Sequence, residues 1–180
     1  PGASSLDELP WKQVFDSYAC IMCTRCHEVC PAHQSGTPLS PSALEINKRY
    51  FINQNSSDLA GRTTKLDLLQ EAISEDAVWS CTTCMACVEV CPVGNEPMQD
   101  ILQIRRKLVF NAQMPDELAD ALRSLDEQGN SLGESSRKRT RWIKDLDFSI
   151  KDASKEPVEY LWYVGDFASF HQNCVETTRK

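Results

Sequence analysis

Eight of the nine cysteines fall into two runs of identical spacing, and this feature constrains the fold more than any other. The runs are Cys20, Cys23, Cys26 and Cys30, followed by Cys81, Cys84, Cys87 and Cys91. Each has the pattern C-x2-C-x2-C-x3-C-P, and each cysteine of the second run lies 61 positions after its counterpart. A chain of 180 residues therefore contains a thiol-rich unit twice.

Three kinds of structure use cysteines at this density. A secreted disulfide framework spreads its cysteines along the chain, whereas these are bunched, and Asp7 and Glu8 stand where a signal peptide has basic residues. Structural zinc usually takes two cysteines from each of two separated knuckles. The observed spacing matches the bacterial run that holds [4Fe–4S] clusters. The sequence predicts two [4Fe–4S] clusters, with zinc as the alternative.

The spacing also predicts which cysteines share a cluster. Three thiolates at i, i+3 and i+6 can surround one cubane on a single loop, and in the bacterial run the fourth binds the other cluster. The fourth cysteine of each run precedes a proline, Pro31 or Pro92, which redirects the chain. We therefore expect two crossed ligand sets: Cys20, Cys23, Cys26 and Cys91 for one cluster, and Cys81, Cys84, Cys87 and Cys30 for the other.

Charge and composition exclude several functions. The formal net charge is −7, and it becomes −11 once eight thiolates and two oxidised cubanes are included. A chain this acidic is not a sequence-wide nucleic-acid binder. The longest apolar stretch, at 160–164, is too short to cross a bilayer. No nucleotide-binding glycine motif or nucleophile–base motif is present, so we expect no small-molecule substrate site in this chain.

The remaining pattern over residues 1–150 is mainly α-helical. Ser40 and Pro41 predict a helix start, with Ser42 and Glu45 as a capping box. Apolar residues at helical spacing predict a further helix over 66–73. Asn95 and Pro97 start another helix, and a helix opened by residues 115–117 ends at Gly129. We expect an α-helical ferredoxin-like domain with two clusters over 1–150.

Residues 151–180 have a different pattern, which predicts a linker and the first βα unit of a truncated domain. Residues 159–165 predict a buried strand, and Asp166 begins a turn into a helix. Because one βα unit cannot bury itself, both ends of the chain are expected to be cut edges of a longer polypeptide. The preceding basic residues at 137–141 indicate a solvated face, or a docking patch for an acidic partner or an anionic membrane.

The chain resembles the iron–sulfur oxidoreductases related to heterodisulfide reductase. These include the iron–sulfur subunits of glycolate oxidase and anaerobic glycerol-3-phosphate dehydrogenase, and electron-transfer-flavoprotein:quinone-type complexes. The resemblance covers about residues 11–150 and rests on Trp79–Cys87, Glu89–Val93, Ile104–Arg106, Gln128–Asn130 and Arg141–Trp142. Residues 163–169 are similar to the start of the family's cysteine-rich CCG module. Many relatives have cysteine where this chain has Asp166, which puts a third iron–sulfur centre in doubt or suggests a carboxylate ligand.

The resemblance implies electron transfer through both clusters inside a larger, membrane-associated oxidoreductase, linking a flavin donor to a quinone or haem acceptor or the reverse. The partners it implies are a flavoprotein and a membrane quinone or cytochrome b subunit or domain. The location is the cytoplasm at the inner face of the membrane. Two alternatives remain: a heterodisulfide-reductase-like enzyme with its active site in the CCG region, and a structural or sensory metal-binding protein.

Several chemically active residues lie outside the two runs. Cys174 has no cysteine partner and is expected to be a small buried residue. His27 and His33 are expected to hydrogen-bond near a cluster or to be exposed, because the thiolate ligand count is already complete. Arg105 and Arg106 are expected to form surface or interhelical ion pairs rather than to contact a partner flavoprotein.

Overall fold

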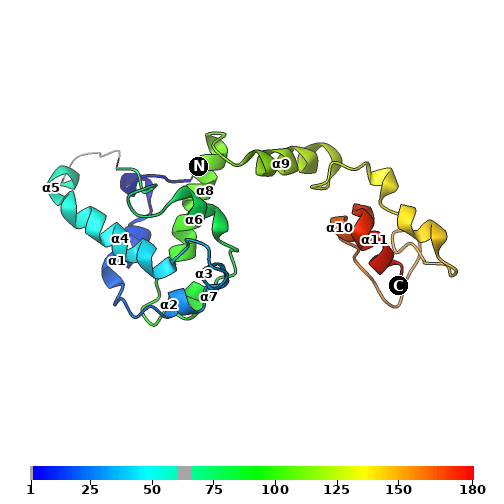
Figure 1. Ribbon diagram of the computed structural model, residues 1–180, viewed down its shortest axis with the longest axis horizontal. Helices are drawn as coiled ribbons and strands as arrows, with labels where there is room; N and C mark the ends of the chain where they lie inside the picture. The colour runs from blue at the N-terminus through cyan, green and yellow to red at the C-terminus, as the bar shows by residue number, and fades with distance from the viewer. Residues whose placement is uncertain (1, 61–65) are drawn as a thin grey trace. The chain divides into compact units, whose positions relative to one another are not determined.

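The computed structural model describes residues 2–60 and 66–180, without the side chain of Asp145. In these ranges the protein is mainly helical, as predicted: no β-strand is formed, and the only ladder contacts are two isolated bridges. The chain divides into two compact units, Pro1–Gln113 and Met114–Lys180 (Figure 1). All eight cysteines of the two runs belong to the first unit.

Over its described residues, the first unit contains a short 3-10 helix, η1, and eight α-helices. Their bounds are η1 Leu6–Glu8, α1 Trp11–Ala19, α2 Arg25–Glu28, α3 Pro31–Gln34, α4 Pro41–Gln54, α5 Ser56–Leu59, α6 Glu75–Ser80, α7 Ala86–Glu89 and α8 Pro97–Phe110. Helix α4 packs against α1 and α8, and the two short helices α2 and α7 lie against each other. The cysteine runs thus meet at one end of a bundle formed by the longer helices (Figure 1).

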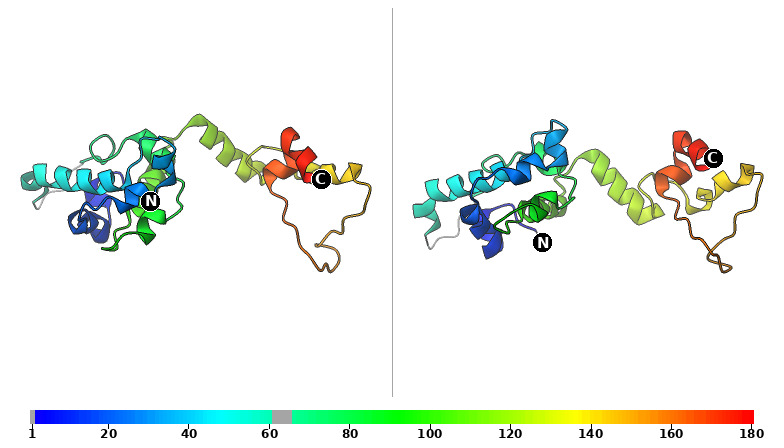
Figure 2. Two further views of the ribbon diagram at one scale, coloured as in Figure 1. Left: turned by 60° about the horizontal axis from the view of Figure 1, so that its bottom comes forward. Right: turned by 90° about the horizontal axis from the view of Figure 1, so that it is seen from below.

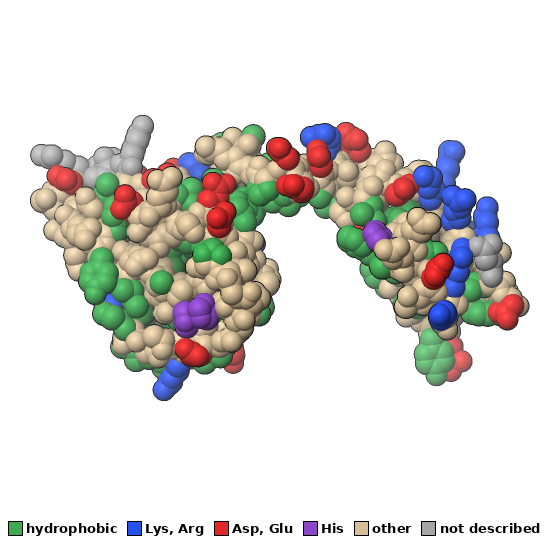
Figure 3. All heavy atoms as spheres, in the orientation of Figure 1, with side chains coloured by type: hydrophobic (Ala, Val, Ile, Leu, Met, Phe, Trp, Pro, Cys, Tyr) green, Lys and Arg blue, Asp and Glu red, His purple; other side chains and the backbone are tan. Residues whose placement is uncertain are grey.

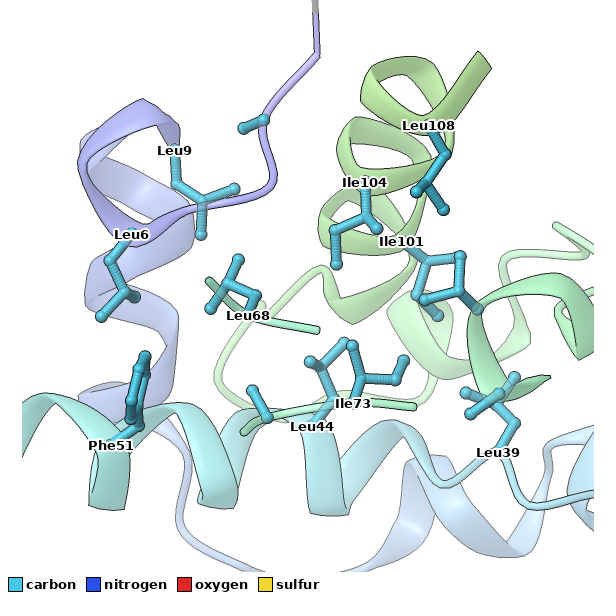
Figure 4. Close-up of a cluster of buried hydrophobic side chains, with 14 of the residues drawn as sticks. Leu6, Leu9, Leu39, Leu44, Phe51, Leu68, Ile73, Ile101, Ile104 and Leu108 are labelled. Atoms are coloured by element: carbon cyan, nitrogen blue, oxygen red, sulfur yellow. The ribbon is translucent and has the colours of Figure 1, made fainter. Parts of the chain in front are cut away.

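The hydrophobic core lies between α4, α8 and the segments around η1 and residues 68–73 (Figure 4). Leu44 and Phe51 of α4 and Ile101 and Ile104 of α8 are buried there. The other side chains labelled in the close-up are Leu6, Leu9, Leu39, Leu68, Ile73 and Leu108. Burial of this apolar surface provides most of the stability of the bundle that carries the cysteine loops.

Helices α4 and α8, the two longest of the first unit, begin with proline at their first position. Ser40 is the N-cap of α4, and its Oγ accepts a hydrogen bond from the N–H of Ala43 at 3.2 Å. The predicted capping box was wrong, because Ser40 rather than Ser42 caps the helix and the carboxylate of Glu45 pairs with Lys48. Proline fits this first position because its missing N–H has no intrahelical partner there.

The predicted helix over 66–73 was also wrong, since this segment is a turn. The side chain of Asp67 accepts a hydrogen bond from the N–H of Leu69 at 3.0 Å, and Gln70 has a φ of +73°. A left-handed residue ends any helical continuation. The apolar spacing instead reflects packing of the turn against the core, in which Ile73 is buried and Leu66 and Leu69 are partly buried.

The second unit contains α9 Asp116–Gln128, η2 Ser136–Lys138, η3 Arg141–Asp145, α10 Asp166–Phe170 and α11 Gln172–Thr178. As predicted, α9 ends at Gly129, whose φ of +71° is the left-handed conformation that terminates helices. Helices α10 and α11 pack against each other. Lys and Arg side chains gather on this unit (Figure 3).

The buried strand predicted at 159–165 was wrong. The segment between η3 and α10 is an open loop (Figure 2), in which Tyr160 and Tyr163 are 84% and 85% exposed. A strand needs a neighbour for its backbone hydrogen bonds, and the described residues contain none. Trp162 does make an edge-to-face contact with Trp142, with ring centroids 5.6 Å apart.

Candidate metal centres

The first cysteine run is a tight loop between two helices. Helix α1 ends at Ala19, Cys20 follows directly, and Cys26 lies on the single-turn helix α2. Met22 and Thr24 have φ values of +56° and +61°. Left-handed residues in a turn direct neighbouring N–H groups toward one side, which makes a concave binding site for an anionic group.

The second run repeats this conformation residue by residue. Thr83 and Met85, which lie 61 positions after Met22 and Thr24, have φ values of +54° and +64°. Helix α7 likewise lies 61 positions after α2. The N–H groups of Cys30 and Cys91 each donate to the carbonyl three residues earlier at 3.2 Å. The sequence repeat is therefore a repeat of backbone geometry.

Two cavities form where the loops meet, and each collects cysteines from both runs. Cys20, Cys23, Cys26 and Cys91 line the first cavity, together with Cys87. Cys30, Cys81, Cys84 and Cys87 line the second. Cys87 thus borders both cavities. The structure brings all eight predicted residues together in two groups, and none of the eight lies away from them.

The donor set fits a cubane better than a single ion. Among the described residues, no group of three or more His, Cys, Asp or Glu side chains is arranged to hold one metal ion. A [4Fe–4S] cluster takes one thiolate at each of four iron atoms, so its ligands need not converge on a point. Each cavity is lined by at least four cysteines, so the donor set matches the cluster in chemistry.

The environment of the thiols depends on burial and on backbone donors. Burial, with neighbouring cysteines, raises the pKa of Cys26 to about 12 and that of Cys87 to about 11. At the exposed Cys84, the N–H of Ala86 lowers the thiol pKa. Cluster binding requires thiolates, so it must release the protons of the buried thiols.

Backbone N–H groups also point at the sulfurs. The N–H of Thr83 donates to Cys81 Sγ at 3.4 Å, and the N–H of Asn95 donates to Cys91 Sγ at 3.2 Å. Hydrogen bonds of this kind stabilise anionic sulfur and help to set the reduction potential of a cluster. The geometry therefore favours a negatively charged group in each cavity.

Two arginines behind the loops were not identified as functional from sequence. Arg105 donates to carbonyl oxygens of Val78, Trp79 and Cys81, so the expectation that it forms an ion pair was wrong. Arg49 Nη1 donates to the carbonyl oxygen of Cys20 at 3.2 Å. A sequence signal did exist, since each arginine is the ninth residue of a helix that begins with proline.

A buried ionic group lies between α1, α4 and α8 and was also missed. Lys48 is fully buried and contacts Asp100, while its Nζ lies 2.9 Å from Glu45 Oε2 and donates to the carbonyl of Gln13 at 2.6 Å. Glu45 also lines the first cysteine cavity. Hydrophobic patterning treats a lysine as a surface residue, so it could not reveal this group.

The histidines near the first run contact each other. His27 and His33 have ring centroids 3.5 Å apart, and His27 Nδ1 lies 2.8 Å from Ser40 Oγ. Ser40 also caps α4, so His27 links the first loop to that helix. Neither ring lines a cysteine cavity.

In the second unit, Asp166 accepts a hydrogen bond from Arg139 Nη2 at 2.7 Å. The carboxylate therefore has a cationic partner. Arg139 also lies over the ring of Phe170, at 5.0 Å. Part of the basic stretch at 137–141 thus forms contacts within its own unit.

Cys174, expected to be buried, is partly exposed.

No helix in the described ranges has the length and apolar character needed to span a bilayer. A polar groove between the N-terminal segment, α4 and α8 contains no cysteine.

Comparison with known proteins agrees with this geometry. Residues 16–95 match the family model of the 4Fe-4S dicluster domain. The chain is 29% identical to the probable iron-sulfur-binding oxidoreductase FadF of Bacillus subtilis, over 94% of this chain and 30% of that protein. It is 27% identical to the EtfAB:quinone oxidoreductase of Syntrophomonas wolfei, over 94% of this chain and 28% of that protein.

A third relative is the probable membrane-anchored ferredoxin of Chromohalobacter salexigens, 30% identical over 92% of this chain and 27% of that protein. The chain thus spans less than a third of the length of these relatives. It binds two [4Fe–4S] clusters, as the cysteine spacing predicts. The chain therefore contains a 4Fe-4S dicluster domain and is similar over most of its length to iron–sulfur oxidoreductases, which agrees with its resemblance to the proteins related to heterodisulfide reductase.

Proposed function

We propose that the chain transfers electrons through its two clusters within a larger, membrane-associated oxidoreductase, between a flavin donor and a quinone or haem acceptor or in reverse. The observation that carries this proposal is the position of Cys87, which borders both cysteine cavities. The two sites therefore share a wall. Each bound [4Fe–4S] cluster carries one electron. Two adjacent clusters can therefore take the two electrons of a flavin one at a time and pass them on singly.

The proposed ligand sets are crossed between the runs. Cys20, Cys23, Cys26 and Cys91 hold one cluster, and Cys81, Cys84, Cys87 and Cys30 hold the other. The membership of the two cavities supports this assignment, because Cys91 lies with the first run and Cys30 with the second. Crossing joins the two halves of the unit, so binding of either cluster stabilises the fold around both.

The walls of the cavities exclude water on the inner side. The fully buried Pro97 lines the first cavity, and Leu39 and Ile101 line the second. Leu39 and Ile101 are both 1% exposed and are part of the hydrophobic core. An apolar wall of this kind limits solvent access, which is one of the factors that set cluster potentials.

The outer edges of the loops are open to partners. Cys23 and Cys84 are exposed, and the neighbouring side chains of Met22 and Met85 are 45% and 50% exposed. Electrons therefore enter and leave at these loop surfaces, where a docked redox group comes closest to the sulfur ligands. Methionine side chains adapt to different partner surfaces.

The names of two relatives support a proposal for the redox partners. One is named an EtfAB:quinone oxidoreductase and another a membrane-anchored ferredoxin. We infer a flavoprotein on one side and a membrane quinone or cytochrome b subunit or domain on the other. We further propose that the chain works in the cytoplasm at the inner face of the membrane.

The test uses the full-length protein, purified anaerobically. We expect eight iron atoms in this domain and, after reduction, an EPR spectrum with two interacting [4Fe–4S]+ signals. Reduced electron-transfer flavoprotein should bleach the visible absorption, and a soluble quinone should restore it. Met22→Asp should slow these transfers, while Phe148→Asp should leave them unchanged, because Phe148 is a 60% exposed side chain of the other unit.

Two results would overturn the proposal. Zinc in place of iron, with no reducible visible absorption, would establish a structural or sensory metal protein. Iron well above eight atoms per complete chain, together with turnover of a disulfide substrate at the C-terminal region, would establish a catalytic heterodisulfide-reductase-like enzyme.

A further inference from the structure

Arg49 and Arg105 hold equivalent positions behind the two cysteine loops. Each is the ninth residue of a 14-residue helix that starts with proline, α4 or α8. Each donates a hydrogen bond to the carbonyl oxygen of the first cysteine in a run: Arg49 to Cys20 at 3.2 Å and Arg105 to Cys81 at 2.7 Å. The repeat of the loops therefore extends to their supporting cations.

The contacts of Arg105 explain how it acts on its loop. Helix α6 ends at Ser80, so its last carbonyl groups lack intrahelical donors. Arg105 Nη2 donates to Val78 at 2.6 Å and to Trp79 at 3.0 Å, and its Nε donates to Val78 at 2.9 Å. The guanidinium also lies 5.3 Å from the ring centre of Trp79. Arg105 thus supplies the donors that a further helical turn would have provided, and it fixes the start of the second loop.

Arg49 makes a weaker version of the same contact. One hydrogen bond joins it to the first loop, and its buried Nη2 has no hydrogen-bond partner. The second loop is therefore held by several charge-assisted bonds and the first by one. Both cations are partly buried, so solvent screens them less than it screens exposed charges.

We propose that Arg49 and Arg105 are paired positioning residues, each fixing the start of one cysteine loop and raising the reduction potential of the cluster which that loop holds. The inference rests on the proposed assignment of one cluster to each loop. Reduction adds one negative charge to a cluster, and a nearby cation stabilises the more negative state. Removing either cation should therefore lower one potential.

The test is an EPR-monitored redox titration of the full-length protein, with iron content measured for every variant. Arg105→Gln should lower the potential of one cluster, and Arg49→Gln should lower that of the other. The expected size is on the order of a tenfold change in the reduced-to-oxidised ratio at fixed potential, or about 59 mV for one electron. Arg106→Gln is the matched control, because Arg106 is adjacent, equally charged and exposed.

A lysine variant separates charge from positioning. Lysine keeps the cation but lacks the fork that reaches three carbonyl groups. Arg105→Lys should therefore retain a potential near that of the wild type while losing its cluster faster on exposure to a chelator. If Arg105→Gln does not hold its clusters, Arg105→Lys decides the question, since a potential lowered despite the retained charge contradicts the inference.

Other outcomes would also overturn it. If Arg106→Gln lowers a cluster potential as much as Arg105→Gln does, surface charge alone explains the effect. If Arg49→Gln and Arg105→Gln lower the potential of the same cluster, the pairing of one arginine with each loop is contradicted. These readouts use chemical reductants and mediators, and neither the flavoprotein nor the quinone takes part in them. Failure of the protein to exchange electrons with flavoprotein and quinone would refute the proposed function but leave the potential shifts in place.

Discussion

The ammonium group of Lys48 on α4 contacts the carboxylate of Asp100 on α8, and both side chains are buried, at 0% and 1% exposure. Glu45 supplies a second carboxylate to the same cation, at 2.9 Å. This ionic group joins two helices that also hold the arginines behind the cysteine loops. Its removal should therefore affect both the fold and the clusters.

Lys48→Met should lower the stability of the loaded protein by about 3–5 kcal/mol, because two buried carboxylates lose their shared cation. The measurement is thermal unfolding followed by circular dichroism and by cluster absorption. Lys155→Met is the control, since Lys155 is 80% exposed in its ion pair with Asp152 and should contribute less than about 1 kcal/mol. Equal destabilisation by the two variants would contradict this account.

Stability should fall as pH rises between about 4.5 and 7. Burial raises the pKa of Glu45 from 4.5 to about 7, and Asp100 and Asp16 add to the effect while Lys48 opposes it. The folded protein thus binds more protons than the unfolded chain in this window, so raising the pH favours unfolding. Asp100, whose pKa is raised to about 6 by burial, acts in the same direction.

Glu45→Gln tests this pH dependence, because glutamine is neutral at every pH. Relative to the variant, the wild type should lose on the order of 1–3 kcal/mol between pH 5.5 and 8. The apparent melting temperatures of the two loaded proteins are compared at each pH. Their difference removes the pH effects that both proteins share. A difference that stays constant over this range would show that Glu45 does not titrate there.

Crossed ligation predicts which cluster each fourth cysteine affects. Cys91→Ser should alter the same EPR signal as Cys23→Ser, and Cys30→Ser the same signal as Cys84→Ser, because serine is a poorer ligand for iron. Cys174→Ser is the control and should change neither signal, as Cys174 lines neither cavity. If Cys91→Ser instead alters the signal affected by Cys84→Ser, each run binds its own cluster.

Asp166→Asn should leave the iron content and the EPR spectrum unchanged. Asp166 is paired with Arg139 at 2.7 Å, with 25% of the aspartate side chain exposed. The variant should lose at most about 1 kcal/mol of stability in the C-terminal unit, because partly exposed ion pairs contribute little. Loss of iron would instead identify Asp166 as a carboxylate ligand to a further centre.

The residues that bind and surround the clusters differ in how far the sequence predicts them. The cysteine positions were predictable, because ligand chemistry requires particular residue types at short, fixed spacing. Helix starts at Pro41 and Pro97 and the helix end at Gly129 were also predictable, since they depend on local backbone preference. Arg105 was misjudged because its partners are carbonyl groups 24 to 27 residues earlier in the chain, which no local pattern reveals.

The cluster type, the mainly helical fold and the 61-residue repeat could all be predicted from the sequence, because each depends on local spacing. Three further features became visible only in the folded chain: Cys87 borders both cavities, Lys48 is buried between carboxylates, and 159–165 forms no strand. The physical reason is that long-range contacts set desolvation and pairing. A lysine is stable inside the bundle only where carboxylates surround it, and a strand forms only beside another strand.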